Sequence, residues 1–483
     1  MAKKILVIEY YNGGIGDSEK EGLKGAFYFA KNLNIFSEPT NISLLPETAK
    51  ESSTTVVDLV KWIVPGTPHD TNTYALGDTG KLYQRTSAGS WSVIRTVSNC
   101  VGQGLELHND YLYYTQNTQI GRYGLLSGSP SFTDNWQTGL NNTSTHKFAP
   151  IKAFLNGFAV GHGNKLAWWD GSVWTLAKLT LPAGFNIRSL EVIDEYLAIG
   201  TWVGTSITAS ESGYVFFWDG TSTTFNFFVQ IPEGGVNALL NSRNRLLTIA
   251  GSNGFIYLNT NPFQKVHKFP KLEYSKNVEV YPGGVTNWKG LANLGVAGST
   301  DSTSIEQGVY EWGAKSDKYN EALNFGYTIS TGTTQSTTMQ IGAVKGIGSL
   351  MLVGWRDGST YGVDKVVQTA DAFATGVYES LIFDDKRPYQ DKLAITLKAT
   401  HKALVSGESV QLGYKVNRAA AYTTGTANST VGSTETRLPL PASGARFKEF
   451  QFEAIPATSA ATSPTITSLA LEYDDLTEEL GGF

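Results

Sequence analysis

Short apolar runs recur along the chain, and each is followed by a glycine-centred turn and a second apolar or aromatic run. Two such runs joined by a tight turn are typical of an antiparallel hairpin, so each repeat predicts a pair of β-strands. Seven repeats of this kind lie at residues 73–84, 111–124, 158–171, 196–220, 246–258, 291–313 and 350–366.

The repeats follow one another at intervals of roughly 40–50 residues, the spacing of blades in a β-propeller. Because one hairpin cannot bury both of its faces, such units stack around a ring until the core is closed. We expect the polar insertions at 204–212 and 299–307 to be surface loops, and the run at 56–64 to lead into the first blade. The sequence therefore predicts a β-propeller of about seven blades over residues 51–390.

The pattern changes after residue 390, where apolar and polar residues alternate strictly. This period of two indicates strands with one buried face. Four such strands within one short segment predict a small, jelly-roll-like β-sandwich over residues 391–475, followed by a tail at 476–483. The alternating positions lie within 393–397, 410–416, 450–454 and 469–473.

The first fifty residues contain few periodic apolar positions and many turn formers. Alone they cannot bury enough surface to offset the entropy of ordering the chain. We expect residues 1–50 to form an extended N-terminal arm that packs on the propeller or on a neighbouring subunit, because Ile5–Ile8 and Phe27–Phe29 need cover. The predicted fold class is all-β.

Composition agrees with this class and excludes several others. Glycines number 51, aromatic residues make up 12% and charged residues only 17% of the 483, with a formal net charge of -5. No basic run suits nucleic acid, and no apolar stretch is long enough to insert into a membrane. Cys100 has no partner for an intramolecular disulfide, and the six histidines show no metal-site spacing.

Asp-Gly pairs follow an aromatic residue in three of the repeats, at Trp169-Asp170-Gly171, Trp218-Asp219-Gly220 and Trp355-Arg356-Asp357-Gly358. Asp-Gly favours a tight hairpin turn, and the aromatic ring before it can pack between blades. We interpret these recurring acids as turn residues rather than as ligands.

A search for catalytic groups finds no complete motif. Sialidase chemistry on a propeller needs an arginine cluster and an Asp-box, but the arginines are scattered and the nearest relative, Ser87–Trp91, lacks the aspartate. No nucleophile elbow is present, and His162 belongs to a strand and its turn (GFAVGHG). The sequence predicts no enzyme, and no catalytic, cofactor-binding or metal-binding residue.

Two segments carry a resemblance to a known group of proteins. Residues 446–473, RFKEFQFEAIPATSAATSPTITSLALEY, resemble the terminal β-sandwich of structural proteins from tailed-bacteriophage particles. The front of the chain, KNLNIFSEPTNISLLPET followed by ALGDTGKLYQ and a tryptophan, is similar to propeller-type virion proteins. The resemblance implies a non-enzymatic structural component of the tail, baseplate or neck. It would be made in the host cytoplasm, reside in the virion, and contact other virion proteins and copies of itself as a homo-oligomer.

Two alternatives remain open. The first is a glycan- or receptor-binding propeller module, an adhesin whose partner is a cell-surface glycan. Trp202, Trp288 and Trp355 are candidates for stacking on a sugar ring. The second is a propeller glycoside hydrolase, which requires acids and arginines that converge on the central funnel of the ring.

Overall fold

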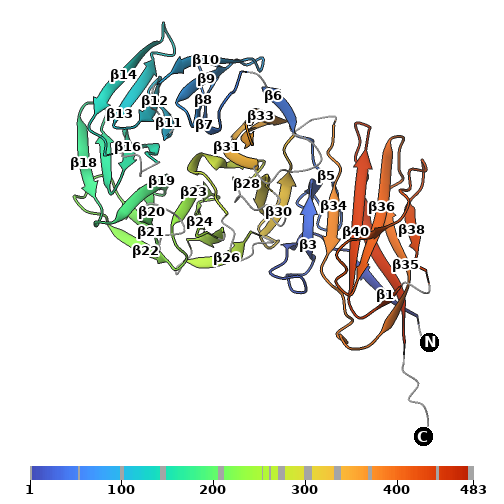
Figure 1. Ribbon diagram of the computed structural model, residues 1–483. Helices are drawn as coiled ribbons and strands as arrows, with labels where there is room; N and C mark the ends of the chain where they lie inside the picture. Colours follow the sequence, from blue (N-terminus) through green and yellow to red (C-terminus); the bar gives the residue numbers. More distant parts are fainter. Residues whose placement is uncertain are drawn as a thin grey trace. The chain divides into compact units, whose positions relative to one another are not determined.

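The structure is a computed structural model, and it describes residues 3–52, 55–97, 103–141, 148–204, 212–252, 254–259, 263–269, 278–297, 307–330, 339–367, 372–441 and 445–476. The protein is all-β: apart from strands, the described residues contain one short 3-10 turn, η1 (Pro282–Gly284). The predicted fold class is therefore confirmed at the level of its secondary structure (Figure 1).

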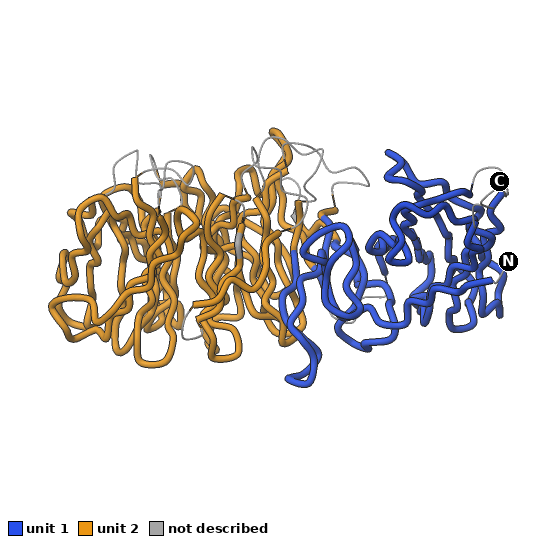
Figure 2. Tube along the Cα trace, turned by 90° about the horizontal axis from the view of Figure 1, so that it is seen from below, with its two compact units in different colours: residues 1–48, 310–328, 366–483 blue, residues 49–309, 329–365 orange. Residues whose placement is uncertain are grey.

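The chain divides into two compact units (Figure 2). Unit 1 contains residues 1–48, 310–328 and 366–483, and unit 2 contains residues 49–309 and 329–365. This division differs from the consecutive segments expected at 1–50, 51–390, 391–475 and 476–483. Unit 1 takes chain from both ends of the sequence because strands from both ends pair with one another.

Five sheets of unit 2 each contain four antiparallel strands in chain order (Figure 1). The first two sheets comprise β7 (Val60–Pro65), β8 (Thr73–Gly77), β9 (Lys81–Arg85), β10 (Trp91–Thr96), and β11 (Gly104–His108), β12 (Tyr111–Gln116), β13 (Gln119–Gly124), β14 (Ser131–Thr138). The next comprises β15 (Ile151–Phe154), β16 (Gly157–His162), β17 (Lys165–Trp169), β18 (Trp174–Thr180). The last two comprise β19 (Phe185–Ile193), β20 (Tyr196–Val203), β21 (Gly213–Trp218), β22 (Phe227–Ile231), and β23 (Val236–Ser242), β24 (Arg245–Ala250), β25 (Phe255–Leu258), β26 (Gln264–Lys268).

The later part of unit 2 adds two more groups of strands. One is the antiparallel pair β27 (Val285–Trp288) and β28 (Leu291–Gly295). The other is a sheet in the order β31-β32-β33-β6, in which β6 precedes all the other strands in sequence yet pairs with β33. The strands of this sheet are β31 (Met339–Ile347), β32 (Leu350–Asp357), β33 (Thr360–Val367) and β6 (Ala49–Ser52).

The repeats found in the sequence coincide with the second and third strands of these sheets. Strands such as β8, β16 and β28 are buried along their whole length. They read as apolar runs because adjacent sheets cover both of their faces. One buried cluster joins Tyr74 and Leu76 of the first sheet to Leu112 and Tyr114 of the second. Apart from Trp91, no residue of the fourth strands β10 and β14 is buried, which explains why these two strands carry no continuous apolar run.

The first strands of unit 2 contact one another in chain order. β7 contacts β11, and the series continues through β15, β19, β23, β27 and β31. β31 in turn contacts β7, so the series returns to its starting strand. The seven first strands of unit 2 therefore lie around a common centre.

Unit 1 contains two larger sheets. One has the order β1-β41-β35-β38, with β39 beside β35, and the other contains the run β30-β3-β34-β40-β36-β37, with β2 beside β3. The strands of the first are β1 (Lys3–Ile8), β41 (Ile466–Asp475), β35 (Lys392–His401), β38 (Glu435–Pro439) and β39 (Arg446–Phe447). Those of the second are β30 (Ala322–Tyr327), β3 (Ala26–Lys31), β34 (Val377–Ser380), β40 (Phe450–Thr458), β36 (Glu408–Val416), β37 (Thr423–Thr424) and β2 (Gly14–Ile15). The remaining short strands are β4 (Leu33–Asn34), β5 (Ser43–Leu44) and β29 (Val309–Gly313).

The four alternating segments predicted after residue 390 are confirmed as β35, β36, β40 and β41. The N-terminal segment behaves differently from the expected arm. β1 pairs antiparallel with β41 from Lys3 opposite Asp474 to Ile8 opposite Leu469, and β3 pairs with β34. Both segments expected to need cover, Ile5–Ile8 and Phe27–Phe29, are thus strands of unit 1 itself.

Some expectations concern segments for which the structure gives little or no information. The insertions at 204–212 and 299–307 fall almost entirely outside the described residues, as do Cys100 and all but the first residue of the tail at 476–483.

Candidate functional site

A cavity of about 400 Å³ lies among the first strands of unit 2. All seven strands that surround the common centre contribute to its wall. Their polar and aromatic side chains in the wall are Trp62, Glu106, Lys152, Glu191, Asn241, Thr286, Asn287 and Lys345.

The cavity wall contains two acids and two bases, so the formal charges of its side chains sum to zero. Lys152 Nζ lies 2.8 Å from Glu191 Oε1, so these two form an ion pair between neighbouring strands. The two asparagines do not point free amides at the cavity. Asn287 donates through Nδ2 to the Asn241 carbonyl (2.6 Å), and Asn241 donates through Nδ2 to the Val192 carbonyl (3.0 Å).

Burial shifts the protonation of the other two charged groups towards their neutral forms. It raises the pKa of Glu106, an effect that Lys152 and Lys345 only partly offset. It lowers the pKa of Lys345, against the opposing influence of Glu106. Burial also disfavours the charged form of Lys152, but the neighbouring Glu191 and Glu106 hold its pKa above the ordinary value. Shifted acids and bases in a cavity occur at catalytic sites and equally in structural ion-pair networks.

No arginine lines this cavity, whose wall is formed by described residues. The hydrolase alternative required arginines together with acids at this place, and the structure brings together only the acids. The sequence analysis missed the charged group. A detectable signal was present, because Glu106, Lys152 and Lys345 are each the one acidic, lysine or arginine residue of their strand, whereas Glu191 shares its strand with Arg188.

The aspartates of the Asp-Gly turns are engaged locally. Asp170 Oδ1 accepts hydrogen bonds from the backbone amides of Ser172 (2.8 Å) and Val173 (2.7 Å). Asp219 Oδ1 accepts the equivalent bonds from Thr221 and Ser222, both at 2.8 Å. These backbone amides lower the pKa of both aspartates. The interpretation of Asp170 and Asp219 as turn residues is supported by this geometry.

His162 is buried, and backbone groups satisfy both of its ring nitrogens. Nδ1 accepts from the Asn141 amide (2.9 Å), and Nε2 lies 2.9 Å from the Leu176 carbonyl, to which it donates. Burial lowers the pKa of His162 and favours this neutral tautomer. The ring is consequently a structural element of its sheet.

The tryptophans proposed for stacking on sugars are all buried. Trp355 is fully enclosed and donates through Nε1 to Asp364 (2.7 Å), and Trp288 donates through Nε1 to the Gly348 carbonyl (3.0 Å). Trp202 packs against Phe148. None of the three candidate rings is available to a glycan, because all three are buried in the core.

A different aromatic surface is exposed, and the sequence analysis did not single it out. Phe227 and Phe228, at the start of β22, are 44% and 52% exposed. With Tyr196 they border a hollow of about 650 Å³, to which Asp194 and Asn259 also contribute. The run FNFFVQI at residues 225–231 was the available signal.

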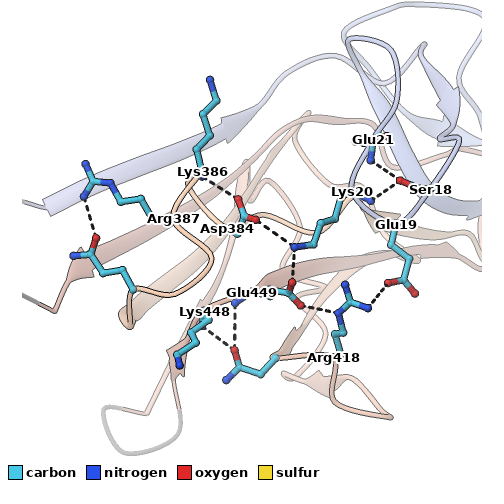
Figure 3. A network of polar contacts seen from close by, with 12 residues as sticks. Ser18, Glu19, Lys20, Glu21, Asp384, Lys386, Arg387, Arg418, Lys448 and Glu449 are labelled. Atoms are coloured by element: carbon cyan, nitrogen blue, oxygen red, sulfur yellow. Dashed lines mark hydrogen bonds and ion pairs between the residues drawn. The ribbon is translucent and has the colours of Figure 1, made fainter.

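Unit 1 contains a network of charges that joins distant parts of the chain (Figure 3). Lys20 Nζ lies 2.5 Å from Glu449 Oε1 and 3.3 Å from Asp384 Oδ2. Arg418 bonds to the same Glu449 (2.8 Å) and lies 3.4 Å from Glu19. Glu19, Asp384 and Glu449 thus each have a basic partner, and the network fastens residues 18–21 to the loops around β36 and β40.

Known proteins add no further assignment. No protein-family model matches the chain, and no curated protein matches its sequence. Over the described part of the chain, no group of three or more histidine, cysteine, aspartate or glutamate residues is arranged to hold a metal ion. The same residues include no helix with the length and apolar character needed to cross a bilayer.

Proposed function

We propose that unit 2 is a seven-bladed β-propeller. The cyclic contacts among its seven first strands support this reading. So does the pairing of β6 with β33, since a strand from the start of the repeats would complete the last blade and fasten the ring. A ring closed in this way resists opening because separating the terminal blades breaks a β-ladder.

Unit 1 is proposed to be a β-sandwich whose two sheets share an aromatic core. Phe447 supports this proposal, since its ring lies 5.9 Å from that of Tyr473 in one sheet. On its other side the ring lies 5.2 Å from Phe450 in the other sheet. Aromatic rings at such distances are typical of tightly packed interiors.

For the whole chain we propose a non-enzymatic structural role as a rigid protein–protein interaction scaffold in the tail, baseplate or neck of a tailed-phage virion. The observation that carries it is the placement of exposed apolar side chains on outermost strands. Ile5 and Val7 lie on β1, while Phe227 and Phe228 lie on β22. Apolar groups on a rigid sheet edge suit contact with other proteins. The resemblance of residues 446–473 to virion proteins is the reason for proposing a phage particle as the place of this scaffold.

The chemistry of the central cavity is consistent with this role. Its four charges balance, its asparagines are bonded to backbone, and it lacks the arginines of a sialidase-type site. The ion pair between Lys152 and Glu191 joins the neighbouring strands β15 and β19 and needs no substrate.

Particle composition tests the proposal. Phage particles purified from a lysate should contain the chain in a fixed ratio to the major capsid protein, and antibody labelling should place it at the tail vertex. Particles made when its expression is blocked should lack an ordered tail, baseplate or neck. Complete, infectious particles without the chain would refute the structural role.

The aromatic hollow on β22 favours a second candidate, a glycan-binding module. Exposed rings beside a carboxylate and an amide are the groups that recognise a sugar. If this candidate holds, the purified chain binds members of a glycan array, and Phe227→Ala with Phe228→Ala abolishes that binding. Val173→Ala, an exposed apolar change outside the hollow, is the matched control.

A further inference from the structure

β1 is the outermost strand of its sheet, which has the order β1-β41-β35-β38. One side of β1 pairs with β41 over its full length. Among the described residues, no strand pairs with its other side. A strand edge of this kind presents a row of unpaired amide and carbonyl groups and is a template for another strand.

The side chains of this edge are apolar on the solvent face. Ile5 is 63% and Val7 46% exposed, whereas Leu6 and Ile8, which point to the other face, are partly buried. Monomeric proteins usually blunt such edges with charges or prolines along the strand. Here the charges lie towards the ends: Lys3 and Lys4 begin the strand, and Glu9 directly follows it.

The positions of Lys3 and Glu9, which are both exposed, select one pairing of β1 with a copy of itself. Opposite residues of an antiparallel pair point to the same face of the sheet, so Ile5 must lie opposite an odd-numbered residue. In the register centred on Leu6, Ile5 lies opposite Val7 of the partner subunit and Lys3 lies opposite Glu9 of the partner subunit. On this face the pattern thus supplies two apolar pairs and two opposite-charge pairs. Lys4 points to the other face, where Asp385 and Asp475 of its own chain are its ion-pair partners.

Neighbouring registers lose this match. Centring on Ile5 places Lys3 opposite Val7 of the partner subunit, and centring on Val7 places Ile5 opposite Glu9 of the partner subunit. Charge complementarity therefore favours a second copy of the chain in one register, because both members of the charge pair lie within the same short segment.

We propose that two copies of this chain pair through β1, antiparallel and centred on Leu6, so that the sheets of two molecules become one. The contact is isologous and closes on itself as a dimer. This inference does not rest on the proposed virion role, since the purified chain dimerises whether or not it belongs to a particle.

Cysteine cross-linking tests the register. In a Cys100→Ser background, Leu6→Cys places two thiols directly opposite one another. Their Cβ atoms approach to about 4.5 Å, the upper end of the range that a disulfide spans. Mild oxidation should convert most of this variant to a covalent dimer. Ile5→Cys is the matched control, because two copies of position 5 lie diagonally, about 7–8 Å apart, and should cross-link poorly.

Mixing the Ile5→Cys and Val7→Cys proteins should restore a cross-link between the two chains. The proposal would be overturned if the purified chain sedimented as a monomer and the Leu6→Cys variant formed no cross-link. Preferred cross-linking at position 5 would overturn the register.

A charge swap tests the same pairing without cysteines. Lys3→Glu and Glu9→Lys each place like charges at both ends of the interface, and each should weaken the dimer roughly tenfold. The double variant restores opposite charges and should return affinity to within about threefold of the parent. Both side chains are exposed, so the thermal midpoint of each variant verifies that the fold is intact. The pairing would be refuted if neither single variant weakened the dimer, or if the double variant dimerised as weakly as the single variants.

Discussion

Glu379 of β34 and Glu453 of β40 lie directly opposite one another on antiparallel strands, so two carboxylates share one face of a sheet in unit 1. Glu453 is nearly buried and lies over Gly413 of β36, where an added Cβ atom would come within 2.6 Å of Glu453 Oε2. Glu379 accepts a hydrogen bond from the Tyr422 hydroxyl (3.1 Å). Burial, together with the charge of Glu379, raises the pKa of Glu453 to about 7, and Lys415 only partly opposes this.

This pair predicts a pH dependence of stability. Between pH 4.5 and 7 the folded chain binds a proton at Glu453 that the unfolded chain releases, so the free energy of unfolding falls as pH rises. Above pH 7 the loss is complete. Glu453→Gln abolishes this loss of stability. It should therefore stabilise the protein by up to about 3 kcal/mol above pH 7, with little effect below pH 4.5. Urea denaturation at both pH extremes measures the difference. Glu472→Gln, at a partly exposed position on β41, is the control, and an equal gain from it would contradict the assignment.

His162 should remain the neutral Nε2–H tautomer at pH values where an ordinary histidine is charged. Burial lowers the pKa of His162, and its Nδ1 already accepts from a backbone amide, so the folded protein disfavours the imidazolium and stability is lost as pH falls below 6.5. Nitrogen NMR of the imidazole rings reports the tautomer directly, with the exposed His69 as an internal comparison. A midpoint for His162 at or above 6.5 would exclude this hydrogen-bond arrangement.

The two tryptophans before Asp-Gly should differ in their contribution to stability. Trp218 is fully buried and donates through Nε1 to the Ser222 carbonyl (2.8 Å), whereas Trp169 is only partly buried. Trp218→Ala should cost about 3–5 kcal/mol, the range for a large core aromatic, and Trp169→Ala distinctly less. Thermal or chemical denaturation of the two variants tests the order. Equal losses of stability in the two variants would show that the contribution of each tryptophan depends on its position in the turn rather than on its burial.

The sequence revealed the strands whose stability depends on burial at both faces. β8 and β16 lie between neighbouring sheets, so their composition is apolar throughout and their repeat is visible. β14, with SFTDNWQT at a sheet edge, has no such constraint and was not recognised. The charged residues of the cavity were overlooked because each is a single position, and only the fold places Glu106 near Lys152 and Lys345.

The role of the N-terminus could not be derived from local sequence. KKILVI carries too few residues to indicate where it packs, and its partner strand β41 lies at the opposite end of the chain. Pairing between such distant segments depends on the complete fold, because neither strand specifies the other by its own pattern.

Removal of the N-terminal strands should therefore damage unit 1 rather than leave an intact protein without an arm. Deleting residues 1–34 removes β1 and β3, which exposes the edge of β41 and leaves β34 without one of its neighbours. It also removes Lys20, an ion-pair partner of Asp384 and Glu449. Hydrogen exchange of the truncated chain should be fast in β35, β40 and β41 and remain slow in the buried strands of unit 2, such as β16 and β24. Deleting only residues 1–2, ahead of β1, is the control and should change neither. Protection of β41 that survives the longer deletion would show that unit 1 folds without its N-terminal strands.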